Sequence, residues 1–163
     1  SQQMSMLGKD AGAAFNRPTT IELLINPAYR IYYTGSEYAD RLIAFLERGQ
    51  SVYPTYLGSA YAITKPILCQ VYDDITPLET DGIIETETVV PTVLIQELQL
   101  QANRYYSRAG GFMLAYKGGR TFEKSIDFIY EQEGRSVKFI AKPPSRQVDA
   151  RIAMIGEEAV CLF

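Results

Sequence analysis

"TTIELLINPAYRIYY", residues 19–33, is the stretch that decides the expected fold, because β-branched, aliphatic and aromatic residues dominate it. The proline at position 27 cannot donate to a strand ladder. The stretch therefore predicts a strand near a sheet edge, with a bulge or bend at Asn26-Pro27. Residues 1–18 before it, with Gly8 and Gly12, predict an irregular N-terminal segment.

A helix is expected next, because Ser36 can cap a segment that runs to Arg48. Gly49 follows where a helix end favours a left-handed residue. The helix would carry one apolar face, formed by Tyr38, Leu42, Phe45 and Leu46.

The connector after this helix, "QSVYPTYLGSAYA" at residues 50–62, places tyrosines and a glycine in a short span. Exposed rings suit flat ligands, and a glycine lets a backbone approach closely. Residues 62–72 then predict a strand in which Pro66 disfavours a central position.

The rest of the chain reads as strands and turns. Residues 73–90 carry six acids and no base, which predicts a solvated loop and hairpin or a face for a basic partner. Their spacing does not match an EF-hand loop, which argues against the metal-site alternative. Residues 91–119 fit helix or strand in their first part, with a bend at Gly110-Gly111 and a turn at Gly118-Gly119. A terminal hairpin about Gly156 closes an α+β pattern in which strands dominate.

Composition indicates one globular domain of 163 residues, with 47% hydrophobic and 21% charged residues. No apolar run approaches the ~20 residues of a membrane span, and the start lacks a signal-peptide pattern. Two cysteines make no disulfide framework, so a cytoplasmic location is expected. The net charge of −3 hides an asymmetry, because residues 104–151 hold ten bases and five acids. A mixed surface or a local basic face would both fit that count.

The sequence lacks several residue types and motifs on which catalytic sites commonly depend. The chain has no histidine, which removes the commonest proton-transfer residue and any His-anchored zinc or Ser-His-Asp site. No Walker loop is present, because neither Gly-Gly pair begins the required spacing. A non-catalytic protein without cofactor or metal is therefore expected.

Three stretches together resemble one family. Residues 26–32 match an Asn-Pro-x-Tyr-Arg-Ile-Tyr pattern, residues 53–58 match Tyr-x-x-Tyr-Leu-Gly, and a closing strand at 159–163 follows a Gly-Glu turn. In this order they resemble the fifth-subunit (Cas-five) family of CRISPR-associated surveillance complexes, in the RAMP superfamily. The resemblance covers residues 17–163 and is closest to the type I-B branch.

The resemblance implies an α+β, ferredoxin-like (RRM-like) RAMP fold. It would form one domain over residues 19–163, with a partial RRM-like core at 19–72 and a β-rich part at 73–163. The family begins with a further strand and helix that residues 1–18 do not supply, so the fold would be N-terminally incomplete. That would expose a sheet edge, which a second copy in a homodimer or another partner would cover.

The implied function is a non-catalytic subunit of the Cascade complex in antiviral defence. It would bind the 5′ handle of the CRISPR RNA and contact the backbone and large subunits, without membrane attachment. The type I-C branch cleaves precursor RNA with Tyr, Lys and His, and this chain lacks the histidine. Two alternatives remain: a metal-independent endoribonuclease using Tyr and Lys, and a β-rich assembly domain with no RNA role.

Rings that stack on bases and cations that meet phosphates are the side chains expected to bind RNA. The alternative interpretation of each candidate is that it does not contact RNA and serves as a core, turn or solvent-exposed residue. The candidates are Arg17, Arg30, Tyr53, Tyr56, Gly58, Arg104, Arg108, Lys117 and Arg120.

Overall fold

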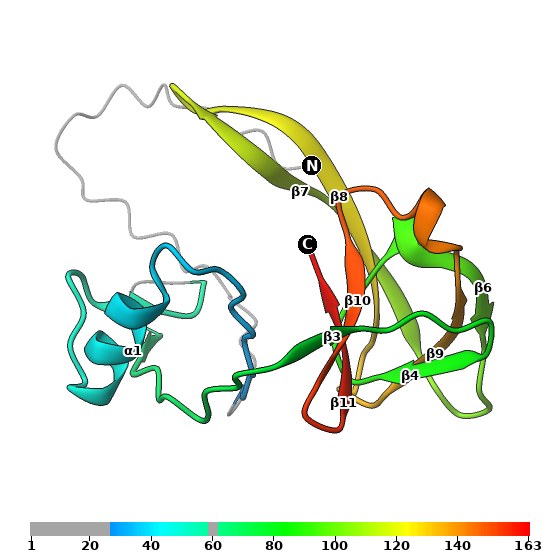
Figure 1. Ribbon diagram of the computed structural model, residues 1–163, viewed down its shortest axis with the longest axis horizontal. Helices are drawn as coiled ribbons and strands as arrows, with labels where there is room; N and C mark the ends of the chain where they lie inside the picture. Colours follow the sequence, from blue (N-terminus) through cyan, green and yellow to red (C-terminus); the bar gives the residue numbers. More distant parts are fainter. Residues whose placement is uncertain (1–26, 59–61) are drawn as a thin grey trace, which may run out of the picture. The chain divides into compact units, whose positions relative to one another are not determined.

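The computed structural model describes residues 27–58 and 62–163 (Figure 1). The chain divides into two compact units, Ser1–Ile31 and Tyr32–Phe163. In the first unit, the described residues 27–31 form neither helix nor strand. The strand predicted over residues 19–33 is therefore absent from residue 27 onward, and its earlier part lies outside the described residues. The irregular segment predicted for residues 1–18 also lies outside them.

Helix α1 spans Ala39–Glu47, so the predicted helix is confirmed. Its C-terminus is a Schellman motif: the Gly49 N–H donates to the Leu46 carbonyl at 3.0 Å, and the Gln50 N–H donates to the Phe45 carbonyl at 2.8 Å. Gly49 has φ of +60°, as that motif requires. The N-terminal prediction was wrong, because Tyr38 rather than Ser36 occupies the N-cap and its side chain accepts no capping hydrogen bond.

The predicted ferredoxin-like fold is wrong. That fold joins its βαβ units in one sheet, whereas in the described part of the chain no strand precedes α1 and the strands form four small antiparallel sheets. Strand β1 (Thr55–Tyr56) pairs only with β2 (Ile63–Thr64), in a two-stranded sheet. Strand β2 ends before Pro66, which lacks an N–H, so the strand predicted over 62–72 shrinks to two residues.

The remaining strands form three three-stranded antiparallel sheets. The first has the order β4 (Ile83–Thr86), β9 (Val137–Ala141) and β6 (Ile95–Gln99). A 3₁₀ turn, Thr92–Leu94, leads into β6, so the start of residues 91–119 is neither the helix nor the single strand considered for it. Strands β4 and β9 place alternate side chains in the core, and Phe139 and Val137 of β9 are fully buried there.

The second sheet contains the long hairpin of β7 (Tyr106–Gly118) and β8 (Thr121–Glu131) (Figure 1). Strand β5 (Val90–Pro91) pairs with the other edge of β8. Pairing shifts register between Ala109 and Phe112, which is a β-bulge at the predicted Gly110-Gly111 bend. A Cβ on Gly110 would lie 2.7 Å from Asp127 Oδ1, so the close approach of that carboxylate requires glycine.

The third sheet has the order β11 (Glu158–Leu162), β10 (Arg151–Ile155) and β3 (Ile75–Pro77). Strands β10 and β11 are the predicted terminal hairpin, with Ile155 opposite Glu158 across the turn. Strands β3 and β4 pair with β10 and β9 instead of with each other, so the hairpin predicted within residues 73–90 is absent. A 3₁₀ turn, Pro144–Arg146, lies in the segment that connects β9 to β10.

A buried threonine links the first and third sheets. Thr86 Oγ1 on β4 donates to the Ala159 carbonyl on β11 at 2.6 Å. Thr88 Oγ1 accepts the Cys161 N–H at 3.1 Å, which adds a second bond between the same segments. Satisfying these polar groups lets the sheets pack closely without an unpaired buried donor.

Glu131, at the end of β8, is a carboxylate buried to 4% exposure. It accepts four N–H groups: those of Tyr105 and Glu133, and the backbone and guanidinium N–H of Arg135. Burial by itself raises its pKa, but these donors outweigh burial and lower the pKa to about 2. The carboxylate thereby joins the start of β7 to the turn between β8 and β9.

No helix within residues 27–58 and 62–163 combines the length and hydrophobicity that a bilayer span requires.

We expect Glu131→Gln to destabilise the fold, because either orientation of the amide turns an NH₂ toward two N–H donors. The lowered pKa means that the ionised carboxylate stabilises the fold above its unfolded value of 4.5, and that this contribution is lost as pH falls toward about 2. Urea unfolding across this pH range should therefore show a smaller pH dependence for the variant. Glu157→Gln in an exposed turn is the control and should behave like wild type. Equal pH dependence in Glu131→Gln and wild type would contradict this role.

Candidate nucleic-acid interface

The connector between α1 and β2 places its tyrosines at the surface. Tyr53 is 79% exposed and Tyr56 is 56% exposed, so neither is a core residue. Their neighbours Val52, Pro54 and Thr55 instead line a pocket under the helix. Thr55 Oγ1 donates to the Thr64 carbonyl at 2.6 Å, which fixes β1 against β2 and so positions Tyr56.

Gly58 follows these rings with φ of +72°, a left-handed conformation that favours glycine. Apart from Gly58 itself and its two neighbours in the chain, no described atom lies within 4 Å of the place where a Cβ would be. The backbone here is open to a ligand, although the positive φ alone is enough to explain the glycine. Tyr61, in the same connector, lies outside the described residues.

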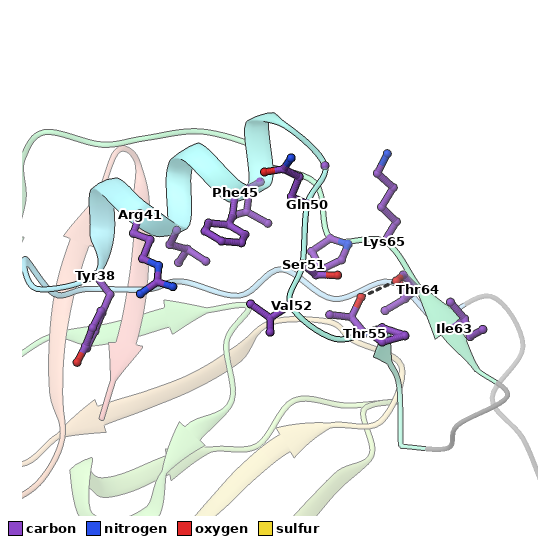
Figure 2. Close-up of a pocket in the computed structure, with 15 residues that line it drawn as sticks. Tyr38, Arg41, Phe45, Gln50, Ser51, Val52, Thr55, Ile63, Thr64 and Lys65 are labelled. Carbon is purple, nitrogen blue, oxygen red and sulfur yellow. Dashed lines mark hydrogen bonds between the residues drawn. The ribbon is translucent and has the colours of Figure 1, made fainter.

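The pocket beside the connector has a volume of about 580 Å³ (Figure 2), within the usual range for small-ligand sites. One wall is the apolar face of α1 and the other is the connector with β2. No carboxylate is found among the described residues that line it, and the two cations among them are Arg41 and Lys65. The lining residues are Tyr38, Arg41, Leu42, Phe45, Leu46, Gly49, Gln50, Ser51, Val52, Pro54, Thr55, Ile63, Thr64, Lys65 and Pro66.

The two pocket cations are held in different ways. The Arg41 guanidinium lies 5.6 Å from the centroid of the Phe45 ring, a cation–π contact along the helix. A Cβ on Gly49 would lie 2.9 Å from Lys65 Nζ, so the ammonium sits against the C-terminal end of α1. Cations are favoured at helix C-termini by the helix dipole. An apolar floor with these two charges suits a flat ring that carries a nearby anion.

The predicted basic group around the Gly110-Gly111 bend is mostly engaged within the protein. Arg108 forms an ion pair with Asp127, and Lys117 pairs with Glu123 at 3.2 Å. Arg104 Nη1 donates to the Ser136 carbonyl at 3.1 Å, which ties it to the turn before β9. The Arg108 hydrogen bond, with a further bond from the Gly111 N–H, lowers the pKa of Asp127. Phosphate would have to compete with internal carboxylates for Arg108 and Lys117.

Arg120 differs from that group. It lies at the tip of the β7–β8 hairpin, is exposed, and makes no ion pair or hydrogen bond with any residue that the structure describes. Arg30 is exposed in the first unit, and Arg17 lies outside the described residues. The structure therefore brings Tyr53, Tyr56 and Gly58 together, and it gives Arg104, Arg108, Lys117 and Arg120 separate environments along β7, β8 and their flanks.

Comparison with protein-family models, curated proteins and solved structures finds no match to this chain.

The pocket was missed by sequence reasoning. The apolar helix face that lines it, with Leu42, Phe45 and Leu46, was predicted, but no pocket was inferred from that face. None of the residues of α1 is fully buried in the described structure. Helical periodicity shows which side chains share a face, but it does not show how completely that face is covered.

Proton-transfer chemistry finds little support in the described residues. Burial raises the pKa of the Cys161 thiol to about 11, so this cysteine stays protonated and inert. The Asp149 hydrogen bond raises the pKa of Lys124, away from the range of a general base. No cluster of potential metal ligands occurs among residues 27–58 and 62–163. The geometry therefore suits stacking and charge contacts.

We expect Tyr53→Ala and Tyr56→Ala to fold with wild-type stability, within about 0.5 kcal/mol, because both rings are exposed. The control Phe139→Ala removes a fully buried ring and should cost ~3–5 kcal/mol. Chemical unfolding of the three variants measures this difference. A loss at Tyr56 comparable to that at Phe139 would assign Tyr56 to the core and contradict the described exposure.

Proposed function

We propose that this chain is a non-catalytic, RNA-binding subunit of a CRISPR RNA-guided surveillance complex (Cascade), and that it binds the 5′ handle of the CRISPR RNA. The observation that carries the proposal is the exposure of Tyr53 and Tyr56 beside an apolar pocket with two cations. These rings belong to the Tyr-x-x-Tyr-Leu-Gly stretch on which the family resemblance depends. The backbone and large subunits are its proposed partners, in the cytoplasm.

Single-stranded RNA presents flat bases joined by anionic phosphates, and proteins hold it by ring stacking and by Arg or Lys contacts. Exposed tyrosines supply the stacking surface, and the pocket offers an apolar floor next to Arg41 and Lys65. The open backbone at Gly58 adds space for close approach. A β-rich assembly domain without an RNA role would not need two exposed tyrosines in one short connector.

We expect Tyr56→Ala to weaken binding of the repeat-derived handle RNA by ~1–3 kcal/mol, and Tyr56→Phe to keep most of the affinity because the ring remains. Binding should also weaken as salt rises, because phosphate contacts release counterions. Fluorescence titration at two salt concentrations measures both effects. Leu57→Ala, a change of an adjacent partly exposed aliphatic side chain, is the control. Equal affinities for Tyr56→Ala and wild type would remove Tyr56 from the interface, and salt-insensitive binding would contradict the phosphate contacts.

The non-catalytic part of the proposal has its own test. We expect labelled precursor RNA to remain intact when it is incubated with the protein, with or without Mg²⁺, because the chain lacks histidine and its described residues hold no metal-ligand cluster. Gel analysis over time is the measurement. A discrete product at the repeat that disappears in a Tyr or Lys variant would establish the metal-independent endoribonuclease instead.

A further inference from the structure

One face of the β7–β8 hairpin passes from buried to exposed along its length. On β8, Phe128 and Ile126 are only 6% and 3% exposed. Alternate residues of a strand share a face, so Phe122 lies on the same face further toward the tip. The cross-strand pairs Phe112–Ile126 and Tyr116–Phe122 place two more rings there. The core-facing side of the hairpin therefore continues outward as an aromatic surface.

The outer rings are accessible. Phe112 is 50% exposed, Tyr116 64% and Phe122 37%. Strand β5 pairs with β8 only at Phe128 and Ile129, so toward the tip β7 is the one described strand that pairs with β8. Ring contacts organise the surface, with centroids 5.2 Å apart for Tyr116–Phe122 and 5.1 Å for Phe112–Phe128. A two-stranded ribbon of this kind is marginally stable alone, so exposed rings on it signal a binding surface.

The charge of the outer hairpin fits a polyanion. Residues 110–126 hold three bases and one acid, in a protein whose net charge is −3. The acid, Glu123, pairs with Lys117, and alternation along the strands puts both on the face opposite the rings. Lys124 shares the aromatic face, although Asp149 holds its ammonium at 2.6 Å. Of the three cations, Arg120 at the tip is the one without a described carboxylate partner, so it can contact a phosphate.

Arg120 occupies an unfavourable backbone conformation. Gly118 and Thr121 pair across a two-residue turn in which Gly119 has φ of +57° and Arg120 has φ of +63°. Turns with both central φ angles positive favour Asn and Gly, and a long side chain there is strained. A strained position that carries a charged side chain at an exposed tip points to a role for that charge.

We infer that the outer β7–β8 face is a second RNA-binding platform, on which Phe112, Tyr116 and Phe122 stack on unpaired bases and Arg120 contacts the adjacent phosphate. The platform rests on the proposed RNA-binding function and adds a contact separate from the Tyr53 and Tyr56 connector. A positive tip beside flat rings fits single-stranded RNA better than an apolar protein surface, which would need no charge there.

The first test uses the full chain and a short fluorescein-labelled oligouridine. Removing one ring, in Phe112→Ala or Tyr116→Ala, should weaken binding roughly 5-fold to 150-fold, the range that stacking on one base supplies. Tyr116→Phe should bind like wild type. Met113→Ala is the matched control, because Met113 is also 64% exposed and lies on the opposite face of the same strand. Thermal melts confirm that each variant is folded.

The second test separates charge from structure. Arg120→Asn suits the left-handed conformation, so it should raise the melting temperature while it lowers RNA affinity and the salt dependence of binding. Arg120→Lys should retain most of the affinity. Raised stability with unchanged affinity would overturn the role of the tip.

The outcomes distinguish the platform from the proposed function. If Tyr56→Ala weakens RNA binding and the Phe112 and Tyr116 variants do not, the platform is wrong and the proposed function stands. If wild-type protein binds no RNA, both are wrong. If the ring variants abolish self-association on size-exclusion chromatography and leave RNA binding unchanged, the face is a protein interface and the platform is wrong.

Discussion

The buried carboxylate of Glu131 is the constraint on which the β-rich part depends. An ionised carboxylate is costly to bury unless its oxygens are fully hydrogen-bonded. Four N–H groups from Tyr105, Glu133 and Arg135 meet this requirement, and in doing so they fix the start of β7 against the turn that leads to β9. Since β8 pairs with both β5 and β7, the geometry at its end sets the base of the long hairpin.

The β7–β8 hairpin is buried where it begins near Glu131 and exposed toward its tip, and these two parts serve different purposes. Near Glu131 the hairpin contributes Phe128 and Ile126 to the core, whereas the same face further out exposes rings. The connector after α1 shows a similar division, since Thr55 is fixed by a hydrogen bond while Tyr53 and Tyr56 face outward. Both proposed RNA contacts thus consist of exposed rings next to backbone that internal contacts hold in place. Such preorganisation lowers the ordering cost of binding.

Local signals in the sequence predicted several elements correctly. Gly49 marked the end of α1, the Gly110-Gly111 pair marked the bulge, and Gly156 marked the terminal hairpin. These features depend on backbone conformations that few residue types adopt, so a single position carries the information. The predicted ferredoxin-like fold failed for the opposite reason. It required the strands before and after α1 to join one sheet, and such an arrangement of distant segments is not encoded in any one position.

The sequence by itself determined the residue chemistry of this protein: no histidine, many tyrosines, a basic stretch within an acidic chain, and turns at its glycines. Only the tertiary structure decided which of those side chains are available. It paired Arg108 with Asp127 and Lys117 with Glu123, left Arg120 at an exposed tip, and turned Tyr56 toward solvent. The physical reason is that exposure and charge pairing depend on which distant strands become neighbours, and that choice is made by the packing of the whole chain.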